Sequence, residues 1–124
     1  MRNQEEEVQK SVVSYLKLVY PNARYCASLG GIRTSFKQAV KAKATGYIKG
    51  FPDLQICVPM TKGGMEGGVY HGLFLEIKKD KKSYATKEQK EWIEYLNEVG
   101  YCARVSKGLD ESIQIIDDYF NQKI

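Results

Sequence analysis

The segment that decides the fold reads Gly50-Phe51-Pro52-Asp53-Leu54-Gln55-Ile56-Cys57-Val58, and it returns after a glycine-rich connection as Leu73-Phe74-Leu75-Glu76-Ile77-Lys78. Both apolar runs predict β-strands, because they are short, contain β-branched or aromatic residues, and are bounded by Pro or Gly. Together they predict a hairpin. An acid precedes the first strand, and an acid and a lysine end the second.

These three charged residues indicate a possible catalytic site. Strand side chains alternate between faces, so Glu76 and Lys78 point to one side and Ile77 to the other. If Asp53 faces the same side, two mutually repelling carboxylates converge there. Mg²⁺ relieves such repulsion, taking oxygen ligands from one or two carboxylates while keeping several waters. The pattern therefore suits metal-assisted phosphodiester hydrolysis, although a Pro-Asp turn and a solvated ion pair would look the same.

Length and composition limit the protein to one domain. The 124 residues leave room for a single core, so we treat residues 1–124 as one unit. No apolar run approaches the ~20 residues of a membrane span, so we expect no membrane partner. The N-terminus has no apolar stretch typical of a secretory signal, and we interpret Cys26, Cys57 and Cys102 as buried thiols of a reducing compartment. We expect a cytoplasmic protein of a bacterial or phage-infected host cell.

The charge distribution favours a polyanionic partner. The net charge is only +4, but the chain carries no acid between Glu7 and Asp53, a stretch that holds eight bases. Among them, Arg33, Lys37 and Lys41 recur every four residues and would form one stripe on a helix. A merely solvated basic face is the alternative.

Periodicity and capping signals predict the remaining elements. We expect helices over residues 5–19, 34–45 and 86–99, and another from Asp110 onward. Further strands are expected at residues 24–29 and 101–105. Thr86 and Gln89 match a capping box, so Gln89 could serve only its own helix. This order predicts an α/β domain with a small mixed central sheet flanked by helices.

At this point the chain resembles the VRR-NUC (virus-type replication-repair nuclease) domain of the PD-(D/E)XK nuclease superfamily, in particular its stand-alone phage members. The resemblance covers nearly the whole chain. It rests on Gly50-Phe51-Pro52-Asp53-Leu54, Gly72-Leu73-Phe74-Leu75-Glu76-Ile77-Lys78, Thr86-x-x-Gln89-x-x-Trp92 and Gly100-Tyr101, with Glu5-x-x-Val8-Gln9 and Gly30-Gly31-x-Arg33 as supporting matches. It implies a restriction-endonuclease-like αβββαβ core.

The resemblance also implies the roles of the site residues. Asp53 and Glu76 would bind Mg²⁺ or Mn²⁺ with help from the Ile77 backbone carbonyl, and Lys78 would assist the nucleophile or the transition state. Glu5 would hold a water of the metal or a second metal, with Glu6 as the alternative, and Gln89 would line the site. We assign DNA contacts to six bases: Arg33, Lys37, Lys41, Lys49, Lys79 and Lys82.

The implied substrate is branched DNA. We expect a metal-dependent, structure-selective endodeoxyribonuclease that resolves four-way (Holliday) junctions as a homodimer, because a twofold dimer most simply cuts two symmetric strands. Phe36, Tyr47 and Phe51 are candidates for the dimer contact. A monomeric flap or nicking endonuclease and a DNA-binding module with a vestigial site remain as alternatives. A restriction-type enzyme would need a recognition insertion that this length does not accommodate. We interpret His71 as a surface or hairpin residue rather than a catalytic base.

Overall fold

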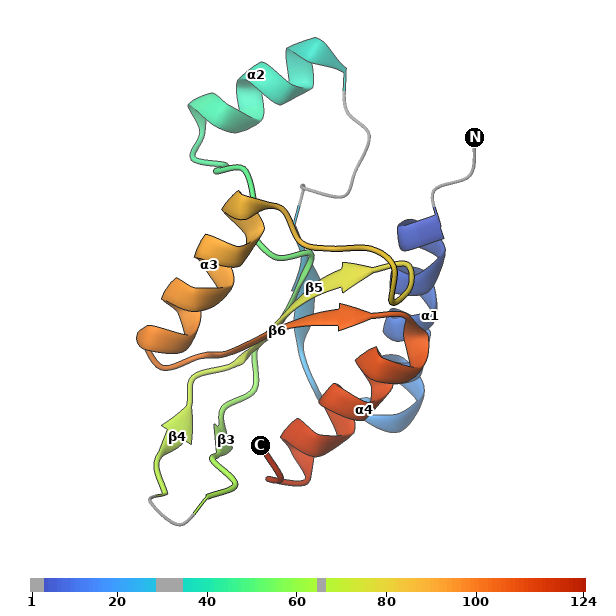
Figure 1. Cartoon of the computed structure of the whole chain (residues 1–124), viewed down its shortest axis with the longest axis vertical. Helices are drawn as coiled ribbons and strands as arrows, with labels where there is room; N and C mark the ends of the chain where they lie inside the picture. The colour runs from blue at the N-terminus through green and yellow to red at the C-terminus, as the bar shows by residue number, and fades with distance from the viewer. Residues whose placement is uncertain (1–3, 29–34, 65–66) are drawn as a thin grey trace.

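The computed structural model describes residues 4–28, 35–64 and 67–124. Within these ranges, helices lie around a central four-stranded sheet, and a second, two-stranded sheet stands beside it (Figure 1). In chain order the helices and strands are α1 (Gln4–Val19), β1 (Tyr25–Ala27), α2 (Phe36–Ala44), β2 (Leu54–Ile56), β3 (Met60–Thr61), β4 (Val69–Tyr70), β5 (Leu73–Lys78), α3 (Lys87–Glu98), β6 (Cys102–Lys107) and α4 (Leu109–Phe120).

The central sheet is mixed, as predicted. Its strand order is β1-β2-β5-β6. The first three strands form an antiparallel meander, in which Leu54 lies opposite Leu75 and Gln55 opposite Phe74. β6 is parallel to β5, and α3 makes the crossover between them that parallel neighbours require. The predicted αβββαβ core is therefore confirmed, with α2 inserted between its first two strands and α4 added at its end.

The alternation of β5 divides the core into two layers. Leu73, Leu75 and Ile77 pack with α1 and α4 on one face, and Phe74 packs with α3 on the other. All six residues of β5 are buried, because helices cover both of its faces. Glu76 and Lys78 share the α3 face with Phe74, so the predicted separation of these charges from Ile77 is confirmed.

The predicted hairpin of β2 and β5 is confirmed, and its connection has structure of its own. The connection forms a second, two-stranded sheet, in which Met60 pairs with Tyr70 and Thr61 with Val69. Strands of two residues are too short to show a period in the sequence. This small sheet packs against α4 through Tyr70 and Tyr119, whose ring centroids lie 5.9 Å apart.

Two of the three cysteine predictions are wrong. Cys102 is buried in the sheet, but Cys26 and Cys57 are exposed. Cys26 lies on β1, the edge strand, opposite Gln55. The face of the sheet that carries Cys26 is covered by α3 only over β5 and β6, so an apolar neighbourhood in the sequence did not lead to burial.

The helix α2 projects from the sheet and packs little against it (Figure 1). It begins with a capping box between Ser35 and Gln38 and has no buried residue. Its Phe36 side chain is 86% exposed. The helix α2 is therefore supported by its own sequence and its capping box, and not by burial of its side chains in the core.

Leu16 and Leu18 of α1 offer a matched test of the layered core. Leu16 is fully buried and Leu18 is 82% exposed. We expect Leu16→Ala to lower the free energy of unfolding by about 2–5 kcal/mol, because it leaves a cavity between the sheet and α4. Leu18→Ala should change it by less than about 0.5 kcal/mol. Urea denaturation measures both, and equal effects would contradict the packing described.

Candidate active site

The loop before β2 places Asp53 beside β5. Gly50 has a φ of 95°, and a Cβ at this position would lie 2.7 Å from the backbone carbon of Glu88 at the start of α3. Only glycine allows this approach. β2 begins at Leu54, so its backbone ladder ends before it reaches Ile77. The Asp53 side chain continues the ladder instead: its Oδ2 accepts a hydrogen bond of 2.7 Å from the Ile77 N–H.

Glu76 is a buried carboxylate that lacks its full set of partners. The residue is only 2% exposed, and its Oε1 has no hydrogen-bond partner among the residues the structure describes. Burial raises the pKa of the Glu76 carboxyl well above its usual range. A hydrogen bond with Asp53 and the charge of Asp53 raise this pKa further, whereas the charge of Lys78 lowers it. Glu76 and Asp53 thus form the converging acid pair that the sequence predicted.

Lys78 links the acid pair to α1. Its Nζ lies 3.8 Å from Glu76 Oε2 and 3.9 Å from Glu5 Oε2, and the residue is 6% exposed. A buried ammonium requires such partners. Glu6, the alternative to Glu5, lies 3.7 Å from Lys10 Nζ, and the choice between the two acids as the site residue of α1 stays a prediction.

The donor set fits a hard divalent cation. The buried carboxylate of Glu76 meets the part-buried carboxylate of Asp53. One oxygen of Glu76 lacks a partner within the described residues, and oxygen ligands suit Mg²⁺ or Mn²⁺. No group of three or more His, Cys, Asp or Glu side chains in the described ranges is arranged to hold a metal by itself. The protein would therefore supply two carboxylates and leave the other positions to backbone oxygen and water, as is usual for Mg²⁺.

The sequence predicted that Gln89 lines the site or caps its own helix, and that Tyr47 is a candidate for the dimer contact. Gln89 caps its own helix, since its Oε1 accepts a 2.8 Å hydrogen bond from the Thr86 N–H, and its role in the site remains a prediction. Tyr47 was considered only as a dimer contact. It is half-buried, and burial followed by the charges of Asp53 and Glu76 raises the pKa of its hydroxyl. Tyr47 therefore belongs to the surroundings of the acid pair, which no sequence signal indicated.

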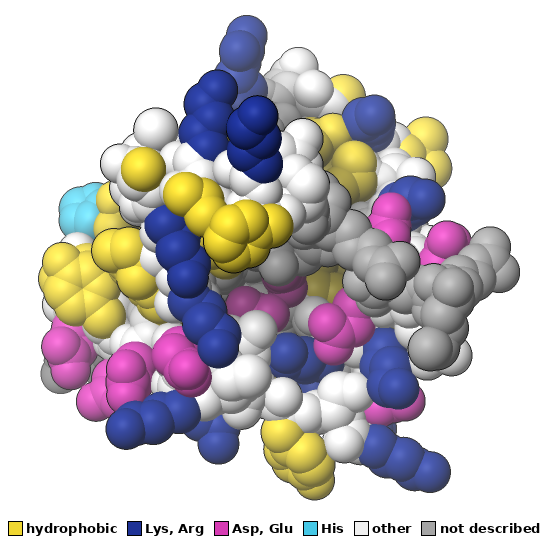
Figure 2. Space-filling model, turned by 90° about the horizontal axis from the view of Figure 1, so that it is seen from above, with side chains coloured by type: hydrophobic (Ala, Val, Ile, Leu, Met, Phe, Trp, Pro, Cys, Tyr) yellow, Lys and Arg dark blue, Asp and Glu magenta, His cyan; other side chains and the backbone are white. Residues whose placement is uncertain are grey.

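The bases proposed for DNA contact lie on exposed surfaces. Lys37, Lys41, Lys79 and Lys82 are exposed, and Arg33 lies outside the described residues. Lys49 is also exposed, with its Nζ 3.7 Å from a carboxylate oxygen of Glu88. Viewed from the α2 end, basic and hydrophobic side chains lie side by side around a hollow that contains acidic side chains (Figure 2). Exposed bases close to an acidic site suit phosphate binding, and the assignment of these bases to DNA contacts stays a prediction.

Two other predictions concern neighbouring residues. Phe51 is partly buried, because its ring packs edge-on against Phe74 at 5.5 Å and Trp92 at 5.0 Å, and its assignment to a dimer contact stays a prediction. His71 is exposed at the start of β5, where its ring packs against Tyr101. It lies away from the acid pair, in agreement with its interpretation as a surface or hairpin residue.

The raised pKa of Glu76 predicts a pH-dependent stability of the metal-free protein. A carboxyl whose pKa is higher in the folded state binds more protons there, so the free energy of unfolding falls as pH rises above the unfolded value of 4.5. We expect Glu76→Gln to raise Tm at pH 8 in EDTA by roughly 4 °C or more and to change it little at pH 5. Added Mg²⁺ or Mn²⁺ should then stabilise only the wild type.

The control is Glu98→Gln, which removes an exposed acid from the end of α3. Thermal unfolding followed by circular dichroism compares the variants. A Glu76→Gln protein that is less stable than wild type at pH 8 would show that the buried Glu76 carboxylate does not destabilise the folded protein.

Comparisons with known proteins identify the family. No family model and no curated protein matches the chain. Among solved structures, a "VRR_NUC domain protein" shares 39% sequence identity, with 95% of this chain and 88% of that chain covered and a TM-score of 0.74. A second structure, a "VRR_NUC domain", has the same fold at 19% identity and a TM-score of 0.60, covering 95% and 99%. No helix among the described residues is long and apolar enough to cross a membrane. With 39% identity over nearly its whole length and an acid pair on a matching core, the chain belongs to the VRR-NUC family of PD-(D/E)XK-type nucleases.

Proposed function

We propose that this protein is a metal-dependent, structure-selective endodeoxyribonuclease that acts on branched DNA and resolves four-way junctions as a homodimer. The observation that carries the proposal is the buried Glu76 carboxylate, which lies between Asp53 and Lys78 with one oxygen unpartnered in the described part of the chain. A binding module would have no reason to retain such a costly arrangement.

Each residue of the site then has a defined task. Asp53 and Glu76, with the Ile77 backbone carbonyl, would hold Mg²⁺ or Mn²⁺, which supplies activation of water and neutralisation of phosphate charge. Lys78, held by Glu76 and Glu5, places a positive charge where the phosphoryl oxygens or the attacking oxygen carry negative charge. Glu5 positions Lys78, and it is also the candidate ligand for a second metal or a water of the first. Gln89 would line the site from the start of α3.

The bases of α2 and the neighbouring loops would grip the DNA backbone. Phosphate contacts set position and affinity without reading sequence, as a structure-selective enzyme requires. Phe36, beside these bases on α2, is the most exposed of the three candidates from the sequence for the contact between two copies. A monomeric flap or nicking endonuclease would use the same site without this contact.

Cleavage of labelled DNA tests the proposal. The substrates are a four-way junction, a flap and a linear duplex, each with Mg²⁺ or Mn²⁺. We expect paired, metal-dependent cuts in the junction that are lost by at least 100-fold in Lys78→Ala, since one preorganised charge contributes about that much. Binding should remain. Lys123→Ala, an exposed lysine near the C-terminus, is the control, and circular dichroism confirms that each variant folds.

Other outcomes separate the alternatives. Cuts confined to the flap, by a protein that sediments as a monomer at micromolar concentration, would favour the monomeric enzyme. Tight binding with no cleavage under either metal would identify a binding module and reject the nuclease proposal.

The salt dependence of binding tests the role of α2. We expect Lys37→Ala and Lys41→Ala each to weaken junction binding and to reduce the slope of log K against log salt by about one unit, because each lost phosphate contact removes one released counterion. Lys90→Ala, an exposed lysine of α3, is the matched control. Slopes identical to wild type, measured by fluorescence anisotropy, would exclude α2 from the DNA interface.

A further inference from the structure

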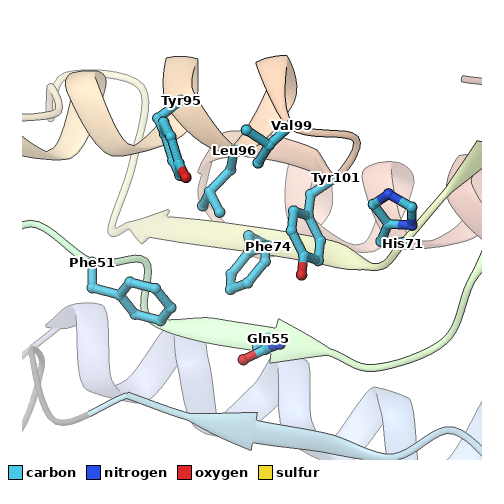
Figure 3. A pocket seen from close by; sticks show the side chains of 8 residues that line it. All are labelled: Phe51, Gln55, His71, Phe74, Tyr95, Leu96, Val99 and Tyr101. Carbon is cyan, nitrogen blue, oxygen red and sulfur yellow. The ribbon is translucent and has the colours of Figure 1, made fainter.

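An aromatic cavity opens on the α3 face of the sheet, between α3 and the strands β2 and β5 (Figure 3). Its volume is about 530 Å³, within the range of small-ligand sites. The residues that define it are Phe51, Gln55, His71, Phe74, Tyr95 and Tyr101. None of them has a role in the site described above.

The sheet register fixes the position of this cavity relative to the acids. Gln55 follows Asp53 by two residues along the chain, and Phe74 precedes Glu76 by two. Gln55 and Phe74 lie opposite each other, so they form the side-chain row next to the acid pair on the same face. Two residues of a strand span about 7 Å. The cavity therefore begins about one side-chain row from the proposed metal ligands.

The walls of the cavity are fixed by packing. Gly100 has a φ of 103°, and a Cβ there would lie 2.6 Å from the His71 ring, so only glycine leaves space for this ring. The His71 ring packs edge-on against Tyr101 at 5.4 Å, and Tyr101 packs edge-on against Phe74 at 5.1 Å. These contacts hold the rings in place while one side of the cavity stays open to solvent.

Gln55 supplies the polar group of the cavity. It is half-buried, and the structure records no hydrogen bond of its carboxamide with any described residue. A carboxamide carries both donors and an acceptor, so it can pair with the edge of a planar heterocycle that has both. Aromatic side chains stack on the faces of such heterocycles.

We propose that this cavity receives an unpaired nucleobase from the DNA strand whose phosphate lies at Asp53 and Glu76. This inference rests on the proposed function, which places a DNA phosphate at the acid pair. A base inside a duplex is stacked on both faces and cannot enter such a cavity unless it leaves the helix. Selection for DNA whose nucleotides next to the cut are unpaired, or can unpair at a branch point, would follow directly, without any reading of sequence.

Binding of DNA that lacks single bases tests the proposal. Lys78→Ala protein, which should bind without cutting, is titrated with a flap substrate in which each unpaired position near the branch is made abasic in turn. We expect one position to weaken binding about tenfold, as loss of one stacked base does. In Tyr95→Ala and Gln55→Leu combined with Lys78→Ala, the same abasic change should have little further effect. Leu18→Ala, on the opposite layer, is the control.

Each outcome bears on the cavity separately from the nuclease activity. An abasic effect that vanishes in the cavity variants supports base binding, even if the wild-type protein cuts none of the substrates. Equal binding of all abasic and intact DNAs overturns the proposal, even if cleavage is robust. A Tyr95→Ala protein with altered sedimentation but an unchanged abasic effect would assign the cavity to a contact between copies and would also overturn it.

Discussion

The burial of the Glu76 carboxylate is the constraint on which the rest of the site depends. An acid that is 2% exposed next to Asp53 is costly, and within the described ranges of the chain it is the charge of Lys78 that offsets it. The Asp53 carboxylate cannot turn away, because the Ile77 N–H holds it at 2.7 Å. The folded chain thus maintains a local concentration of negative charge that a divalent cation would relieve. In this type of site, the arrangement of charges that would bind the cation lowers the stability of the metal-free protein.

The two faces of β5 explain how the protein stays folded with a buried carboxylate in this strand. Leu73, Leu75 and Ile77 anchor the strand against α1 and α4, while Glu76 and Lys78 point to the other face. The helix α1 contributes both to the core and to the charged site. Its middle packs in the core, and its first turn brings Glu5 to within 3.9 Å of Lys78. The packing that stabilises the domain therefore also sets the geometry of the charged groups.

The helices cover the sheet unevenly, and this leaves space for a substrate. The helix α3 covers β5 and β6 but leaves the β1 and β2 side of its face open, as the exposed Cys26 shows. The aromatic cavity lies along this boundary, and α2 projects above it with exposed lysines. An acidic centre, an aromatic cavity and a basic helix thus lie along one accessible face. This arrangement suits a DNA strand, whose phosphates are negatively charged and whose bases are aromatic.

The sequence by itself determined the features that depend on local or periodic signals. These include the alternation of β5, the Thr86 cap, the order of the core elements and the acid pair. It did not reveal β3 and β4, because two-residue strands carry no period. Tertiary packing alone decided three further points. It packed Phe51 against Trp92, left Cys26 and Cys57 exposed, and brought Glu5 close to Lys78 while Glu6 lies near Lys10. Glu5 and Glu6 are neighbours in sequence and therefore point in directions about 100° apart around the helix axis. Which of them lies near Lys78 depends on the face of α1 that packs against the sheet.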